Sequence, residues 1–199
     1  MQILFEKQPK KIRRISYFLK GYGQSMTDHA DFMQQAIAEA GKALAAGEFP
    51  VGCVMVHRGR VVSKGRRINS RAPDENELDH AEIVALRELF AKHPEIDRAK
   101  IIVYSSMEPC LMCYVTLLLN GFRNFVYAYE DIMGGGTSLD LQSLNPLYRD
   151  MEADVTGHVL RRQSLELFKA FFADQDNTYW QDSPLALYTL AQIADEETE

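Results

Sequence analysis

Short apolar runs alternate with segments of helical periodicity along most of the chain, and this alternation limits the fold more than any other sequence feature. Parallel strands need a crossover connection, usually a helix, so alternating strands and helices predict a mostly parallel sheet with helices on both faces. Arg58 and Gly59 form a turn between two apolar runs, which adds a hairpin at the sheet edge. We therefore predict an α/β protein, a three-layer α/β/α sandwich around a mixed, mostly parallel five-stranded sheet.

The boundaries of the expected elements follow from apolar spacing and turn residues. Helical spacing runs from Phe32 to Leu44 and stops at Gly47, and later helices are expected at residues 81–92, 110–120 and 161–172. Strands are expected at residues 51–57, 60–65, 100–106 and 124–129, with a short strand near residues 153–159.

The length of 199 residues suits one domain with short tails. We predict a basic arm at residues 1–25, one folded domain at residues 26–175 and an acidic tail at residues 176–199. The arm carries six basic residues and one acidic residue, whereas the rest of the chain carries 16 basic and 27 acidic residues. An Arg-rich, acid-poor start would suit a transit peptide, and a flexible arm upstream of Met26 is the plainer interpretation.

The cysteines and the hydropathy of the chain indicate a cytoplasmic protein. No apolar run reaches the ~18 residues that span a bilayer, and no stretch has the pattern of a secretory signal. Cys53, Cys110 and Cys113 are few and odd in number, which argues against a disulfide framework. In a reducing compartment these thiols are free to bind metal.

Two short motifs at the starts of expected helices carry the chemistry. His80 and Glu82 begin one helix, and Cys110 and Cys113 follow Pro109 at the start of another. Each motif alone is weak, because Cys-x-x-Cys also occurs in redox pairs and in structural zinc sites. A structural zinc site would need a second pair of thiolates, and a redox pair would leave the histidine motif unexplained.

Together the motifs predict a catalytic zinc site. Cysteines three residues apart lie on one face of a helix, and the positive end of that helix favours the thiolates that a metal requires. His80, Cys110 and Cys113 supply three ligands, which leaves the fourth tetrahedral position open for water. Zinc lowers the pKa of bound water toward ~7, and Glu82 can carry protons without being a ligand.

This combination, His-x-Glu followed by Pro-Cys-x-x-Cys, resembles the signature of the zinc-dependent cytidine deaminase superfamily. The likeness covers about residues 28–173. It is strongest to bacterial tRNA adenosine deaminases and to related nucleoside and guanine deaminase-like proteins. The resemblance implies a cytidine deaminase-like fold, one zinc ion per chain and a homodimer in which loops of one subunit approach the pocket of the other.

The resemblance also implies substrate contacts at four positions, and the aromatic ring of a fifth residue, Phe49, adds a separate candidate. Val51 and Gly52 belong to a Pro-Val-Gly segment similar to the one that lines the base pocket in the family. Asn69 lies 11 residues before the zinc histidine, as the substrate-binding asparagine of the family does. Asp131 stands where the tRNA enzymes carry an aspartate, and Phe49 is a candidate for stacking on the substrate ring.

The charge around the expected pocket bears on the substrate. Acidic residues gather where the tRNA enzymes tend to be basic: Asp74, Glu75, Glu77, Asp79 and Glu130. Phosphate contacts dominate nucleic-acid affinity and need Lys or Arg. We therefore expect a neutral free nucleobase or nucleoside as the substrate, with the wobble adenosine of tRNA as the alternative. A third hypothesis, a catalytically silent relative that binds nucleic acid or protein, is opposed by the presence of Glu82 and all three ligands.

Overall fold

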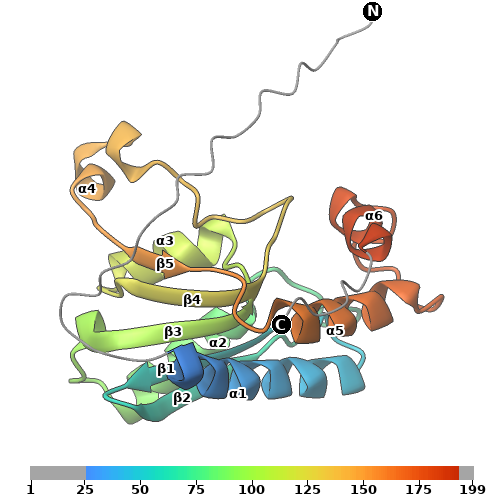
Figure 1. Cartoon of the computed structure of the whole chain (residues 1–199), viewed down its shortest axis with the longest axis horizontal. Coiled ribbons are helices and arrows are strands. Elements are labelled where there is room, and N and C mark those ends of the chain that lie inside the picture. The colour runs from blue at the N-terminus through green and yellow to red at the C-terminus, as the bar shows by residue number, and fades with distance from the viewer. Residues whose placement is uncertain (1–25, 193–199) are drawn as a thin grey trace, which may run out of the picture.

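The computed structural model describes residues 26–192 as a five-stranded sheet between layers of helices (Figure 1). The predicted arm at residues 1–25 and the end of the predicted tail, residues 193–199, lie outside the described residues, so the division of the chain stays a prediction. The elements in chain order are α1 (Met26–Ala45), β1 (Gly52–His57), β2 (Arg60–Arg66), α2 (Ala81–Lys92), η1 (Arg98–Lys100), β3 (Ile101–Met107), α3 (Leu111–Leu119), β4 (Asn124–Tyr129), η2 (Leu141–Ser143), α4 (Pro146–Arg149), β5 (Asp154–Thr156), α5 (Arg161–Ala173) and α6 (Pro184–Ala191).

The sheet has the strand order β2-β1-β3-β4-β5, and its pairings are evenly mixed. β1 is antiparallel to both β2 and β3, whereas β3, β4 and β5 are parallel to one another. The predicted mixed α/β sandwich is confirmed. The share of antiparallel pairing is larger than expected because β1 lies between β2 and β3. The crossover through α2 therefore joins two strands of the same direction across an intervening antiparallel strand.

Two glycines let helices approach the sheet closely on opposite faces. A Cβ added to Gly52 would lie 2.2 Å from the Ala36 carbonyl oxygen of α1, and one on Gly65 would lie 2.2 Å from the Ala81 carbonyl oxygen of α2. A Cβ atom at either position would clash with the helix backbone, so only glycine, which has no Cβ, fits there. The contact at Gly65 fixes the first turn of α2, the turn that follows His80 and contains Glu82.

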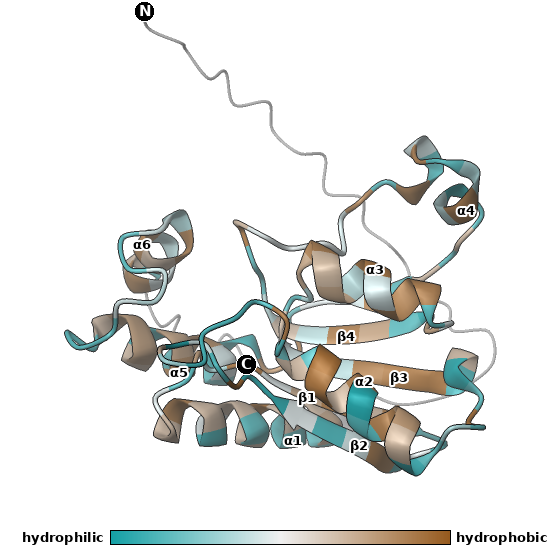
Figure 2. Ribbon diagram, turned by 180° about the vertical axis from the view of Figure 1, so that it is seen from behind, coloured by the Kyte–Doolittle hydropathy of each residue, from teal (hydrophilic) through white to brown (hydrophobic). Residues whose placement is uncertain are grey.

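Apolar side chains fill both sides of the sheet. Along β1, Cys53 and Met55 belong to the core under α2 and α3, and Val54 and Val56 belong to the core under α1. This is the alternation expected of a strand covered on both faces. Figure 2 shows the largely apolar strand β3, with α2 and α3 on the near side of the sheet. None of the described helices is long and apolar enough to cross a lipid bilayer.

Candidate active site

His80, Cys110 and Cys113 lie together at the N-terminal ends of α2 and α3. The Nδ1 atom of His80 is 3.5 Å from the Sγ atoms of both cysteines, and the ligand atoms all lie within 4.8 Å of one another. A tetrahedral zinc ion with ordinary bond lengths would separate its nitrogen and sulfur ligands by about 3.6 Å. The three residues therefore fit a zinc ion in spacing and in donor type, as the sequence predicted.

The state of the Cys110 sulfur also suits a metal. Hydrogen bonding with Cys113 and then with His80 outweighs the opposing effect of burial and lowers the pKa of Cys110 to about 4. Cys110 is therefore a thiolate at neutral pH, which is the form that binds metal. The N-terminal end of α3 adds a positive electrostatic potential at the same point.

Glu82 lies in the first turn of α2 and is only 3% exposed. Its Oε1 atom accepts a hydrogen bond of 2.8 Å from the Ser105 hydroxyl on β3. Burial raises the pKa of Glu82, and the nearby negative charge of Cys110 raises it further. A buried carboxyl group with a raised pKa beside the metal ligands is suited to accept a proton and to return it.

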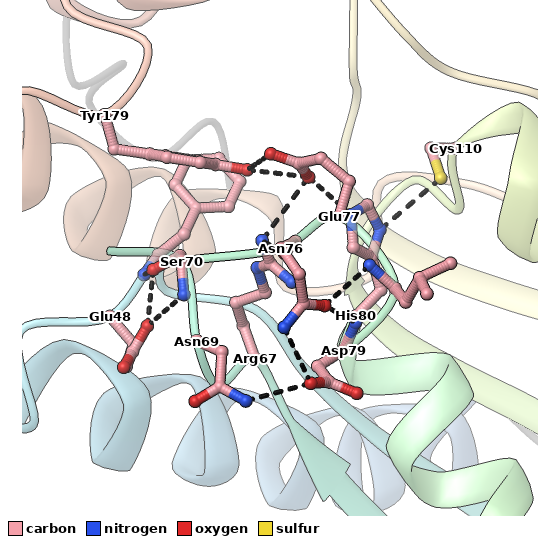
Figure 3. Close-up of polar contacts among 12 residues, drawn as sticks. Glu48, Arg67, Asn69, Ser70, Asn76, Glu77, Asp79, His80, Cys110 and Tyr179 are labelled. Atoms are coloured by element: carbon pink, nitrogen blue, oxygen red, sulfur yellow. Dashed lines mark hydrogen bonds and ion pairs between the residues drawn. The ribbon is translucent and has the colours of Figure 1, made fainter. Parts of the chain in front are cut away.

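Glu77 holds the opposite side of the His80 ring. The Nε2 atom of His80 is 3.1 Å from Glu77 Oε2, so Nδ1 is left facing the two sulfurs. The same carboxylate accepts hydrogen bonds from the Tyr179 hydroxyl at 3.1 Å and from Arg67 Nη2 at 3.3 Å (Figure 3). Carboxylate–histidine contacts of this kind orient metal ligands. In the sequence Glu77 stands out only as one of several acidic residues before His80, and its position three residues before the histidine is the one signal of this contact.

A cavity of about 310 Å³ opens beside these residues. Glu82, His80 and Cys110 line it from the metal side, and Phe49, Val51 and Met107 provide apolar wall. Residues beyond the predicted domain boundary also line it: Tyr179, Trp180 and Leu185. The segment after α5, which was predicted to be an acidic tail, therefore contributes to the wall of the site.

The five predicted substrate residues occupy different places. Phe49, Val51 and Asp131 line the cavity. Gly52 does not line it, and its backbone N–H donates to the Ser106 hydroxyl at 2.9 Å. Asn69 does not line it either, because it adopts a left-handed backbone conformation (φ +56°) and its amide donates to Asp79 Oδ2 at 2.9 Å.

Arg67, two residues before Asn69, lines the cavity instead and was not among the predicted site residues. It directly follows β2 in the chain. The number of residues before His80 does not indicate which residue reaches the cavity, because the loop of residues 67–79 folds on itself. The backbone N–H of Asn76 donates to the Asn69 carbonyl at 2.9 Å.

Much of the acidic charge expected at the mouth is paired. Asp79 binds Arg87 at 2.6 Å, and Glu130 binds Arg161, with Nε 2.7 Å from Oε2. Glu130 also accepts a hydrogen bond of 2.7 Å from the Tyr188 hydroxyl of α6 and does not line the cavity. Glu130 therefore does not act as a free charge beside the substrate, and the sequence-based charge argument is weaker than the residue count implied.

The loop after β4 is attached to the cysteine turn. The backbone N–H of Leu111 donates to the Gly134 carbonyl at 3.2 Å, and that of Gly136 donates to the Pro109 carbonyl at 2.9 Å. The Asp131 carboxylate accepts from the backbone N–H groups of Met133 and Gly134 at 3.0 and 2.8 Å. These contacts hold Asp131 and Cys110 on one wall of the cavity.

Comparisons with known proteins agree with this geometry. The sequence model described as the cytidine and deoxycytidylate deaminase zinc-binding region matches residues 26–129. The tRNA-specific adenosine deaminase of Streptococcus pyogenes is 27% identical over 148 residues, which cover 74% of this chain and 92% of that protein. The tRNA-specific adenosine deaminase 2 of Xenopus tropicalis is 32% identical over 154 residues, which cover 73% of this chain and 89% of that protein.

A solved structure from studies of A-to-I editing by tRNA deaminases at the wobble position shares the fold. It superimposes with a TM-score of 0.58 at 26% sequence identity, covering 69% of this chain and 98% of that chain. The matched part spans nearly the whole of that structure.

Proposed function

This chain belongs to the cytidine and deoxycytidylate deaminase family, and from that premise we propose that it is a hydrolase that removes the exocyclic amine of a nucleobase as ammonia. The observation that carries the proposal is the position of Glu82 beside His80, Cys110 and Cys113 on the wall of one cavity. Hydrolytic deamination needs an activated water and a group that moves protons, and these residues provide for both.

Metal binding and proton transfer fall to different residues. His80, Cys110 and Cys113 would hold zinc, which supplies a Lewis acid and makes water more acidic. Glu82 accepts the proton of the attacking water and delivers it to the ring nitrogen, and a further transfer through Glu82 releases the amine as ammonia. Ser105 holds the Glu82 carboxyl in place by its hydrogen bond.

For the substrate, we propose adenosine within tRNA as the first candidate, with inosine as its product. The support is that the relatives named above are tRNA-specific adenosine deaminases and align over about three quarters of this chain. Enzymes that act on a base within RNA or DNA bind it extruded from the stack. A cavity of about 310 Å³ lies at the small end of the range for ligand pockets and suits one base.

A free nucleobase or nucleoside is the second candidate substrate. Tyr179, Trp180 and Leu185 form part of the cavity wall, so the segment that carries them narrows the approach to the site. Glu77 and Asp131 also line the cavity and would repel a nearby phosphate. Both observations favour a small neutral substrate over a polyanion.

We also propose a homodimer in the cytoplasm. Large apolar side chains are exposed on and near α3: Leu111, Leu119, Ile132 and Met133. Burial of such side chains against a second copy would remove them from water. The described cysteines carry no disulfide, in keeping with a reducing compartment. Sedimentation velocity would measure the mass, and a monomer at micromolar concentration would contradict the dimer.

The function is tested by supplying zinc-loaded protein with two classes of substrate at one ionic strength. One arm measures ammonia released from adenine, guanine, cytosine and their nucleosides, and the other measures inosine formed in a tRNA anticodon stem-loop. Fixed salt matters because RNA binding weakens steeply as salt increases. Turnover in either arm that is absent from a Glu82→Gln variant supports the proposal and identifies the substrate class. Absence of turnover in both arms would overturn it.

A further inference from the structure

Arg67 is a buried cation on the wall of the cavity. The residue is 1% exposed and directly follows β2. Its Nη2 atom donates to the Asn76 carbonyl at 2.6 Å and lies 3.3 Å from Glu77 Oε2. Its guanidinium carbon lies 5.8 Å from the centre of the Tyr179 ring. Figure 3 shows Arg67 reaching toward Glu77, beside the ring of His80.

Two of the three guanidinium nitrogens have no hydrogen-bond partner among the described residues. Nε and Nη1 of Arg67 are buried and unpaired, whereas almost every other buried side-chain polar atom of residues 26–192 is satisfied. Buried donors are normally paired, because an unpaired one loses its hydration without compensation. The neighbouring Arg66 shows the contrast, since its side chain is well exposed and lies 3.9 Å from Glu39.

We propose that Arg67 is a substrate-contact residue that donates hydrogen bonds from these free nitrogens to a neutral acceptor on the base. The acceptor is a ring nitrogen or a carbonyl oxygen. This inference rests on the proposed function, because it assumes that the cavity binds a nucleobase. Since Glu77 contacts both Arg67 and His80, a base held by Arg67 lies close to the metal ligands and to Glu82.

The charges of the cavity favour a neutral acceptor over a phosphate. Arg67 is its one Lys or Arg side chain, and four carboxyl side chains line the same space: Glu77, Glu82, Glu108 and Asp131. Glu77 already lies against the guanidinium. An added anion would meet these carboxylates at short range in a partly dry site, where repulsion is strong. A guanidinium offers only donors, so it selects an edge of the base that accepts.

The test combines enzyme variants with substrate analogues. Arg67→Met and Arg67→Lys are compared with wild type and with Arg66→Met, a control that removes the adjacent arginine on the exposed side. Each protein is assayed on the best substrate of the panel and on analogues that lack one acceptor: the 3-deaza and 7-deaza bases for a purine, or the thiocarbonyl form for a base with a carbonyl. The nucleoside monophosphate is added as a further substrate.

We expect Arg67→Met to lower kcat/KM about 10- to 100-fold at unchanged zinc content, as for loss of a charge-assisted hydrogen bond. One analogue should cause a similar loss in wild type and in Arg66→Met, and almost no further loss in Arg67→Met. Arg67→Lys should recover part of the rate and stay sensitive to that analogue. If Arg67→Met does not fold, Arg67→Lys takes its place in the comparison with the analogues. A shorter, differently shaped donor must weaken the coupling between this side chain and the acceptor on the base.

If the loss of rate caused by Arg67→Met and the loss caused by each analogue simply add, Arg67 only supports the fold and the inference is overturned. A selective loss of the monophosphate in Arg67→Met would also overturn it, because the arginine would then bind phosphate. Wild-type turnover judges the proposed function separately: an enzyme that is active but shows no coupling leaves the function standing without this role for Arg67.

Discussion

Replacement of Glu82 by Gln separates proton transfer from metal binding and from folding. The side chain is 3% exposed, so a larger or smaller substitute would disturb its packing, whereas glutamine has nearly the same shape. Its amide oxygen can still accept the 2.8 Å hydrogen bond from the Ser105 hydroxyl. His80, Cys110 and Cys113 are unchanged, and we therefore expect a folded protein with its zinc.

The expected loss of rate follows from the number of proton transfers that Glu82 serves. General acid–base groups typically contribute ~10²–10⁴-fold. Glu82 is the buried carboxyl beside the metal ligands, and it both accepts and returns protons in the proposed reaction. The loss in kcat should therefore be about 10⁴-fold or more, which corresponds to about 5 kcal/mol of transition-state stabilisation. KM should change much less, because glutamine leaves the shape of the cavity intact.

The assay measures ammonia release by zinc-loaded wild type, Glu82→Gln and Glu88→Gln with the best substrate of the panel. Glu88 makes a matched control on the same helix, where its carboxylate is bonded to Lys92 and to the Lys64 backbone away from the cavity. Metal analysis and circular dichroism establish that zinc and fold are retained. If Glu82→Gln keeps more than about a tenth of the wild-type kcat, another group carries the protons and the reasoning is wrong.

Three further outcomes can be checked. Cys110→Ser should reduce the metal content from about one zinc ion per chain to near zero, while Cys53→Ser should keep it, because Cys53 lies within β1 and is not one of the three ligand residues. Phe168→Ala should lower the free energy of unfolding by about 3–5 kcal/mol in urea titrations, since its fully buried ring packs 5.2 Å from both Phe49 and Tyr129, and a loss below about 1 kcal/mol would contradict this packing. Burial opposes the ionisation of Glu130, but hydrogen bonds from Arg161, His158 and Tyr188 outweigh it and hold its pKa well below the usual range. The resulting stability is present above the usual glutamate pKa of about 4.3 and is lost as the pH falls toward the lowered value, so Glu130→Gln should be less stable than wild type at pH 7, and the gap in melting temperature should close in acid.

The metal site could be predicted because its signals are local. His80 and Glu82 stand at the start of one amphipathic helix, and Cys110 and Cys113 stand at the start of another. Helical spacing and capping depend on residues within a turn of one another, so the sequence indicates them directly. The helix at residues 81–92 was placed with both boundaries correct, and the mixed α/β architecture followed from the same alternation of elements.

The substrate side of the cavity could not be read in this way. Arg67 and Asn69 are two residues apart, and only the fold of the 67–79 loop decides that the arginine lines the cavity and the asparagine binds Asp79. Glu130 is 31 residues from Arg161, so the pairing that removes its free charge cannot be seen in a count of acidic residues.

The segment after α5 shows the same limit most plainly. Its polar residues suggested a tail, yet Tyr179 reaches back over 102 residues to hydrogen-bond Glu77 and completes the cavity wall. Composition and periodicity describe what each stretch of chain can form by itself. Which stretches come into contact depends on how side chains from the whole molecule pack together, so these contacts are seen only in the tertiary structure.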